Sequence, residues 1–122
     1  TTAGRSILSH LPQTEVLELL EAKERRPLTA KTVTDLHAIL DLVHKAREDG
    51  FALADEEGQM GIITVGAAIL DGTGYPVAAV NMAASRRHWN VQQVAKKLGP
   101  LVVETARNIS RTQGFSASYH ES

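Results

Sequence analysis

The segment of residues 60–70 limits the possible folds more than any other part of the chain. It carries no charged residue and is rich in isoleucine and valine, which is typical of a strand buried on both faces. The turn signal Asp71-Gly72-Thr73-Gly74 follows it, and residues 76–83 then have the pattern of a returning strand. We therefore expect an antiparallel hairpin whose first strand is covered by another layer on each face.

Segments with helical periodicity lie on both sides of this hairpin. Apolar side chains recur at helical spacing in residues 3–11, 13–23 and 34–49, and again after Asn90. Residues 51–55 predict a short additional strand. The order of elements indicates an α+β fold in which helices cover an antiparallel sheet.

Several residues predict where these helices begin, end or bend. Thr34 is expected to cap the helix of residues 34–49, and Gly50 to end it in a left-handed conformation. Asn90 and Gln93 have the spacing of a capping box. Pro100 lies within the last helical segment, so we expect a kink or a division there.

The hairpin register determines which side chains share a face of the sheet. If Asp71 and Gly74 pair across the turn, Thr64 lies opposite Asn81 and Ile62 lies opposite Ala83, and both pairs lie on the same face. Two polar side chains would then lie among apolar and small residues. A ligand pocket has this composition, but the two groups could equally bond each other or the backbone within the core.

Composition excludes several classes of site. The formal net charge is -1, which disfavours contact with a phosphate backbone by this segment alone. The chain has no cysteine, which excludes disulfides and thiolate metal sites and suits a cytoplasmic protein. No apolar run approaches the roughly 20 residues that span a bilayer. We expect no cofactor, no metal and no membrane association.

Other candidate groups have simpler interpretations. His37 and His44 share a helix face, but they lack the carboxylates that would complete a metal site. The run Asp55-Glu56-Glu57 could be a catalytic carboxylate pair, although a solvated turn explains it as well.

Four stretches together resemble the C-terminal effector-binding domain of the IclR family of bacterial transcription regulators. They are residues 1–12, residues 47–52, residues 55–62 with the order D-E-E followed by M-G-I, and residues 67–81. Each motif is weak alone, but their order and spacing extend over nearly the whole chain.

The resemblance implies a GAF-like fold that binds small organic acids, in a domain from which earlier strands are absent. It implies a winged helix-turn-helix DNA-binding domain ahead of this segment, and homodimers or homotetramers. The ligand contacts that it transfers are the backbone amides of Thr2 and Ala3 and five sheet positions, namely Ala54, Ile62, Thr64, Asn81 and Ala83. Ala54 stands where one family pattern has an acidic residue. An asparagine at the position of Asn81 resembles the pattern of the branch of the family that senses aromatic acids.

We therefore expect an effector-binding domain in residues 1–114, followed by a flexible tail in residues 115–122. Its predicted function is to bind a small organic acid and so modulate DNA binding by another domain. The alternatives are a dimerisation module without a ligand and a small α+β enzyme. No Ser-His-Asp set or P-loop supports the enzyme, and we expect no catalytic activity.

Overall fold

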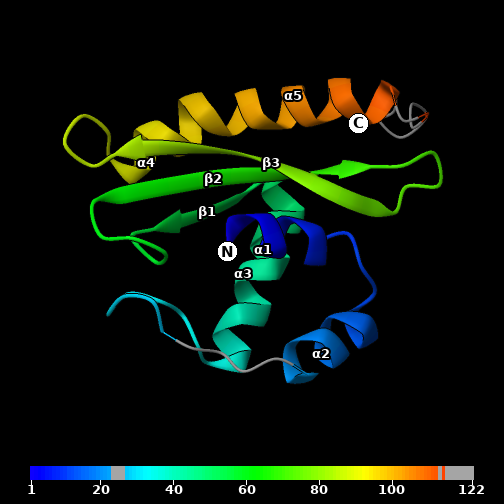
Figure 1. Ribbon diagram of the computed structural model, residues 1–122, viewed down its shortest axis with the longest axis horizontal. Coiled ribbons are helices and arrows are strands. Elements are labelled where there is room, and N and C mark those ends of the chain that lie inside the picture. Colours follow the sequence, from blue (N-terminus) through cyan, green and yellow to red (C-terminus); the bar gives the residue numbers. More distant parts are fainter. Residues whose placement is uncertain (23–26, 113, 115–122) are drawn as a thin grey trace.

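The computed structural model describes residues 1–22, 27–112 and 114. Its helices and strands follow one another as α1 (Thr2–Leu8), α2 (Gln13–Ala22), α3 (Leu36–Asp49), β1 (Ala52–Asp55), β2 (Ile62–Leu70), β3 (Pro76–Ser85), α4 (Val91–Gln93), η1 (Val94–Leu98) and α5 (Gly99–Thr112). The α+β fold class is confirmed, with helices above and below a single sheet (Figure 1). The predicted tail, residues 115–122, lies outside the described residues.

The three strands form an antiparallel sheet in the order β1-β2-β3. Thr64 pairs with Ala54 on one side and Ala83 on the other, whereas Gly66 pairs with Ala52 and Asn81. The predicted pairs Thr64–Asn81 and Ile62–Ala83 are therefore wrong by two residues. A shift of two keeps every side chain on its predicted face, because side chains alternate with a period of two.

The turn explains this register error. Asp71 N donates to Tyr75 O at 2.9 Å, and the Asp71 carboxylate accepts from the N–H groups of Thr73 and Tyr75 at 2.8 and 3.1 Å. The connection therefore spans residues 71–75 and is longer than the tight turn expected. A bulge between Ile69 and Leu70 adds a further irregularity.

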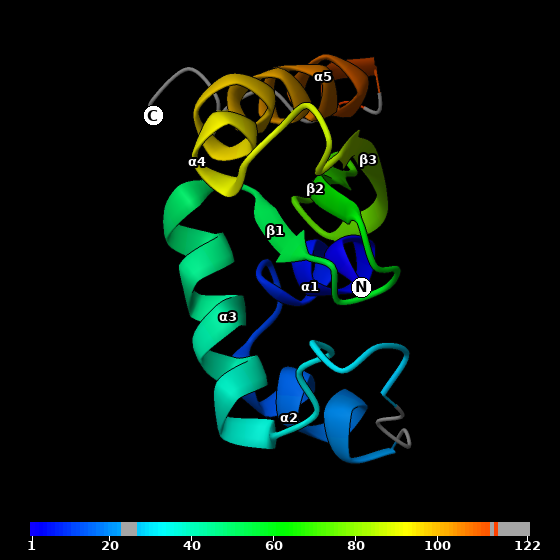
Figure 2. The same ribbon diagram turned by 90° about the vertical axis from the view of Figure 1, so that its left-hand side faces the viewer.

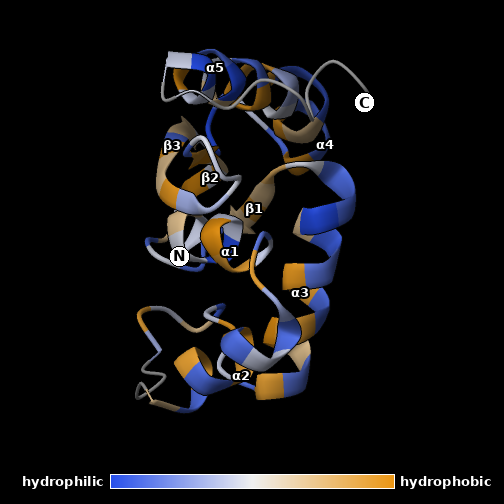
Figure 3. Cartoon of the chain, turned by 90° about the vertical axis from the view of Figure 1, so that its right-hand side faces the viewer, coloured by the Kyte–Doolittle hydropathy of each residue, from blue (hydrophilic) through white to orange (hydrophobic). Residues whose placement is uncertain are grey.

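One face of the sheet packs against the C-terminal helices and forms the main core. Ile63 and Val65 of β2 are completely buried there, and Val94, Val102 and Ala106 of η1 and α5 cover them. The buried residues of α5 include Val102 and Ala106, and hydrophobic and hydrophilic residues both occur along this helix (Figure 3). The predicted covering layer on this face is present.

The other face of the sheet is covered by α1, which contacts all three strands. Helix α3 stands beside β1 and extends down to α2, away from the sheet (Figure 2). Arg47 of α3 donates to the backbone oxygens of Ser9 and Leu11 at 2.6 and 2.7 Å. These bonds fix the chain where it leaves α1, so α1, α2 and α3 surround a space below the sheet.

The predicted helix ends are mostly confirmed. Gly50 ends α3 with a left-handed φ of 84°, and Asn90 and Gln93 form the expected capping box. The prediction for Thr34 was wrong: the N-cap is Asp35, whose carboxylate accepts the N–H of Ala38 at 3.0 Å. A carboxylate is a strong acceptor for the free N–H groups of a first turn and suits the helix dipole.

The disturbance expected at Pro100 takes the form of a π-helical segment, η1, immediately before α5. Proline has no N–H to donate to the carbonyl four residues earlier, and Gly99 N donates five residues back, to Val94 O. Helices α4, η1 and α5 follow one another without an intervening loop (Figure 1). Among the described residues, no helix is both long and apolar enough to span a membrane.

Candidate functional site

A cavity of about 690 Å³ lies below the sheet, between α1, α2, α3 and the segment that joins α2 to α3. This volume is within the range of sites that hold drug-sized ligands, roughly 300–1,000 Å³. Its wall comes from segments far apart in the sequence: Thr1, Thr2, Gly4, Arg5, Ile7, Leu8, Leu19, Leu20, Leu28, Thr32, Val33, Thr34, Ile39, Val43, Ala54, Glu57, Gly58, Thr64 and Asn81.

Four of the seven residues proposed as ligand contacts line this cavity. They are Thr2, Ala54, Thr64 and Asn81. The wall does not include the other three, which are Ala3, Ile62 and Ala83. Thr64 and Asn81 are diagonal neighbours on one face instead of a directly opposed pair.

The side chains of Thr2 and Asn81 are in contact. Thr2 Oγ1 donates to Asn81 Oδ1 at 3.3 Å, although the two residues are 79 positions apart. Gly66 lies opposite Asn81 on the neighbouring strand, and a Cβ atom at Gly66 would come within 2.2 Å of that oxygen. A glycine is therefore needed here for the Asn81 amide to lie across β2 toward α1.

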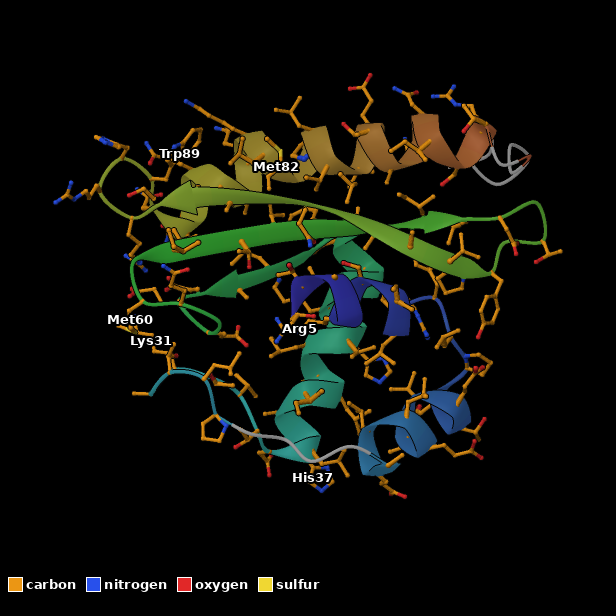
Figure 4. All side chains as sticks on the ribbon, viewed as in Figure 1. Arg5, Lys31, His37, Met60, Met82 and Trp89 are labelled. Carbon is orange, nitrogen blue, oxygen red and sulfur yellow. The ribbon has the colours of Figure 1, made fainter. Side chains whose placement is uncertain are left out.

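Arg5 is a buried cation in the cavity wall. Its side chain extends from α1 toward β1 (Figure 4), where it donates to Leu53 O at 3.1 Å and to Glu57 Oε1 at 2.8 Å. The side chains of Arg5 and Glu57 are only 8% and 17% exposed. Because each charge neutralises the other, this pair adds two hydrogen-bonding groups to the cavity but no net charge.

The acidic turn after β1 is held by cations on either side. Arg86 donates two hydrogen bonds to the Asp55 carboxylate, at 2.9 and 2.6 Å, and these bonds lower the pKa of Asp55. Glu56 accepts from Gly61 N at 2.8 Å and pairs with Lys31 at 3.1 Å, and the Gly61 bond is the main reason that its pKa is lowered. Both carboxylates therefore stay ionised and paired, which suits a structural turn better than acid–base catalysis.

The segment before α3 is fastened to this turn, and the contact closes one side of the cavity. Thr29 Oγ1 donates to Glu56 O at 2.7 Å, and Thr32 Oγ1 donates to Glu57 O. The ion pair from Lys31 to Glu56 joins the same two segments. Residues Thr32, Val33 and Thr34 consequently lie in the cavity wall.

Sequence reasoning missed the lower part of the cavity. The apolar stripes of α2 and α3 were used only to predict helices, yet Leu19, Leu20, Ile39 and Val43 of these stripes line the cavity. A buried core and a buried cavity have the same apolar periodicity, so this pattern contains no signal that separates them. The place of Arg5 in the cavity wall could have been predicted, because Arg5 follows Thr2 by three residues and therefore lies on the same face of the helix.

In the part of the chain that the structure describes, no group of three or more histidine, cysteine, aspartate or glutamate side chains could hold a metal ion.

Comparison with known proteins identifies the family. The family model described as bacterial transcriptional regulator IclR, C-terminal, matches residues 1–111. The chain belongs to the IclR C-terminal family. Members of this family are the effector-binding domains of transcriptional regulators.

Relatives and solved structures agree with this assignment. The p-hydroxybenzoate hydroxylase transcriptional activator of Acinetobacter baylyi is 28% identical over 109 residues, which are 89% of this chain and 40% of the activator. The IclR structure from Thermotoga maritima has a TM-score of 0.86 at 35% identity, over 93% of this chain and 46% of that one.

A third similar structure was solved with a ligand. It is a double mutant of the inducer-binding domain of the PobR transcription factor from Acinetobacter, in complex with 3-hydroxybenzoic acid. Its TM-score is 0.80 at 27% identity, over 90% of this chain and 63% of that one. The chain spans less than half the length of the p-hydroxybenzoate hydroxylase transcriptional activator, the curated relative described above.

Proposed function

We propose that this domain binds a small organic acid in the cavity below the sheet, and that binding modulates DNA recognition by a separate part of the full-length regulator. One observation carries the proposal: polar groups from α1, β2 and β3 converge on one end of an apolar cavity. Convergence of a few polar groups in an otherwise apolar space is the usual composition of a small-molecule site.

The polar end has donors that suit a carboxylate. Asn81 Oδ1 accepts from Thr2, which leaves the Asn81 Nδ2 group as a donor. The Thr64 hydroxyl on the neighbouring strand is a second donor in the wall. The N–H group of Thr2, a residue of the cavity wall, lies in the first turn of α1, where a helix has no internal acceptor for it. Hydrogen bonds to a charged acceptor are roughly twice as strong as neutral ones.

The ligand class is supported by the relatives. A hydroxybenzoic acid is bound by the similar inducer-binding domain from Acinetobacter, which favours an acid with an apolar body here. We propose that the acid is released unchanged, since the Asp55 and Glu56 carboxylates beside the cavity are held by cations. The regulator would act in the cytoplasm as a homodimer or homotetramer, with residues 1–114 as its sensing unit.

Effector binding would change DNA affinity by population shift. A ligand that binds one arrangement of the oligomer more tightly than another moves the equilibrium toward it, by no more than its difference in affinity for the two. The same coupling must act in reverse, so DNA should change the affinity for the acid by the same factor.

The test is calorimetric titration of the full-length protein with aliphatic and aromatic carboxylates. Thr64→Val and Asn81→Leu remove the two donors while keeping similar volume. Each should weaken binding by roughly 10- to 150-fold, since a hydrogen bond to a charged group contributes about 1.5–3 kcal/mol. Thr105→Val is the matched control, because Thr105 is exposed on α5 and outside the cavity. Unchanged affinity in both cavity variants would refute the proposed site.

A further inference from the structure

The cavity has two chemically different ends. Around the start of α1 the wall contains Thr2, Thr64 and Asn81 together with the Arg5–Glu57 ion pair. Farther along α1 it contains Ile7 and Leu8, facing apolar side chains from other helices. A single helix thus contributes polar groups to one end of the space and apolar groups to the other.

The apolar end is built from three helices. Leu20 comes from α2, and Ile39 and Val43 come from α3, one turn apart on the same helix face. Val43 is 3% exposed and Leu20 and Ile39 are half-buried, so this wall extends from the interior toward the surface. Water in such a place would find few hydrogen-bonding partners, which makes it easy for an apolar group to displace it.

Part of the cavity rim that faces solvent is also apolar. Leu19 and Leu28 belong to the wall, yet they are 42% and 68% exposed. An apolar rim favours entry of a ligand with an apolar surface. A very small, highly polar acid would use only the polar end and leave the rest of the cavity unfilled.

We infer that the effector is an amphiphilic acid with an extended apolar chain: its carboxylate lies at the Thr64 and Asn81 end, and its chain lies between α1, α2 and α3 against Ile39 and Val43. This inference rests on the proposed function, because it assigns the ligand class of the same cavity. Ile39 is then the residue that limits the length of the chain.

The first test is a homologous series of straight-chain carboxylates, from acetate to decanoate, titrated into the full-length protein. Each methylene group that enters the apolar end should raise affinity about fourfold, the factor expected for burying one such group. Affinity should stop rising once the chain reaches the end of the cavity.

The second test changes the length of the apolar chain that the cavity can hold. Ile39→Trp adds volume at the apolar end, so the chain length at which affinity stops rising should become shorter, while the shortest acids that bind should be unaffected. His37→Trp is the matched control, because His37 is exposed near the start of α3 and does not line the cavity (Figure 4). This control should keep the length limit of the unmodified protein.

The outcomes separate the inference from the proposed function. If acetate or benzoate binds and affinity does not rise with chain length, the apolar-chain inference is overturned and the organic-acid site stands. An unchanged length limit in Ile39→Trp would overturn the assignment of that residue. If no carboxylate of any length binds, the proposed function fails, and the inference fails with it.

Discussion

Gly66→Ala provides a sharp test of how Asn81 is positioned. An added Cβ would come within 2.2 Å of Asn81 Oδ1 and 3.3 Å of Val80 O. The Asn81 amide is the movable end of an exposed side chain, so it should rotate away and lose its bond to Thr2. That loss should cost about 0.5–1.5 kcal/mol. The reduced freedom of the unfolded chain should offset part of it, by about 0.4–1 kcal/mol.

A double-mutant cycle isolates the contact. In the Asn81→Ala background the clash is absent, so Gly66→Ala should be neutral or stabilising there. The difference between the two backgrounds is the coupling energy, which should be about 0.5–1.5 kcal/mol. Urea unfolding of the four proteins measures it. Gly66→Ala should also weaken carboxylate binding as much as Asn81→Ala does. The same effect of Gly66→Ala on stability in both backgrounds would refute this account.

Three further predictions concern stability. Ser110 is completely buried and accepts the N–H of Leu70 at 3.0 Å, so Ser110→Ala should cost about 1–3 kcal/mol in urea unfolding by leaving that donor unpaired; a smaller loss would mean that water replaces the hydroxyl. Gly50→Ala should cost about 1–2 kcal/mol, since Gly50 has a φ of 84°, and no change in the denaturation midpoint would contradict the left-handed cap. Arg86 lowers the pKa of Asp55 below its usual value of 3.8. The ion pair between Arg86 and Asp55 therefore stabilises the fold fully above pH 3.8, and this stabilisation is lost as the pH falls through the lower pKa of the folded state. Arg86→Gln should therefore be less stable than the unmodified protein at pH 6, and the gap should narrow in acid titrations below about pH 4; a gap independent of pH would exclude the ion pair as its cause.

The sequence alone determined the elements and their faces. The uncharged run in residues 60–70 required a strand covered on both sides, and α1 and α5 supply those layers. The capping pair Asn90–Gln93 and the left-handed Gly50 follow from local chemistry, because each forms bonds with residues only a few positions away. Helix ends of this kind can be predicted from the sequence because their bonds involve no residue distant in the chain.

The tertiary structure decided the register and the cavity. The register depended on a bulge at Ile69 and Leu70 and on a longer turn, which the Asp71 carboxylate organises through bonds that spacing alone does not specify. The contact between Thr2 and Asn81 and the apolar walls of α2 and α3 depend on how the helices are placed against the sheet. Apolar periodicity shows which face of a helix is buried, but only packing decides whether that face meets other side chains or a space for a ligand.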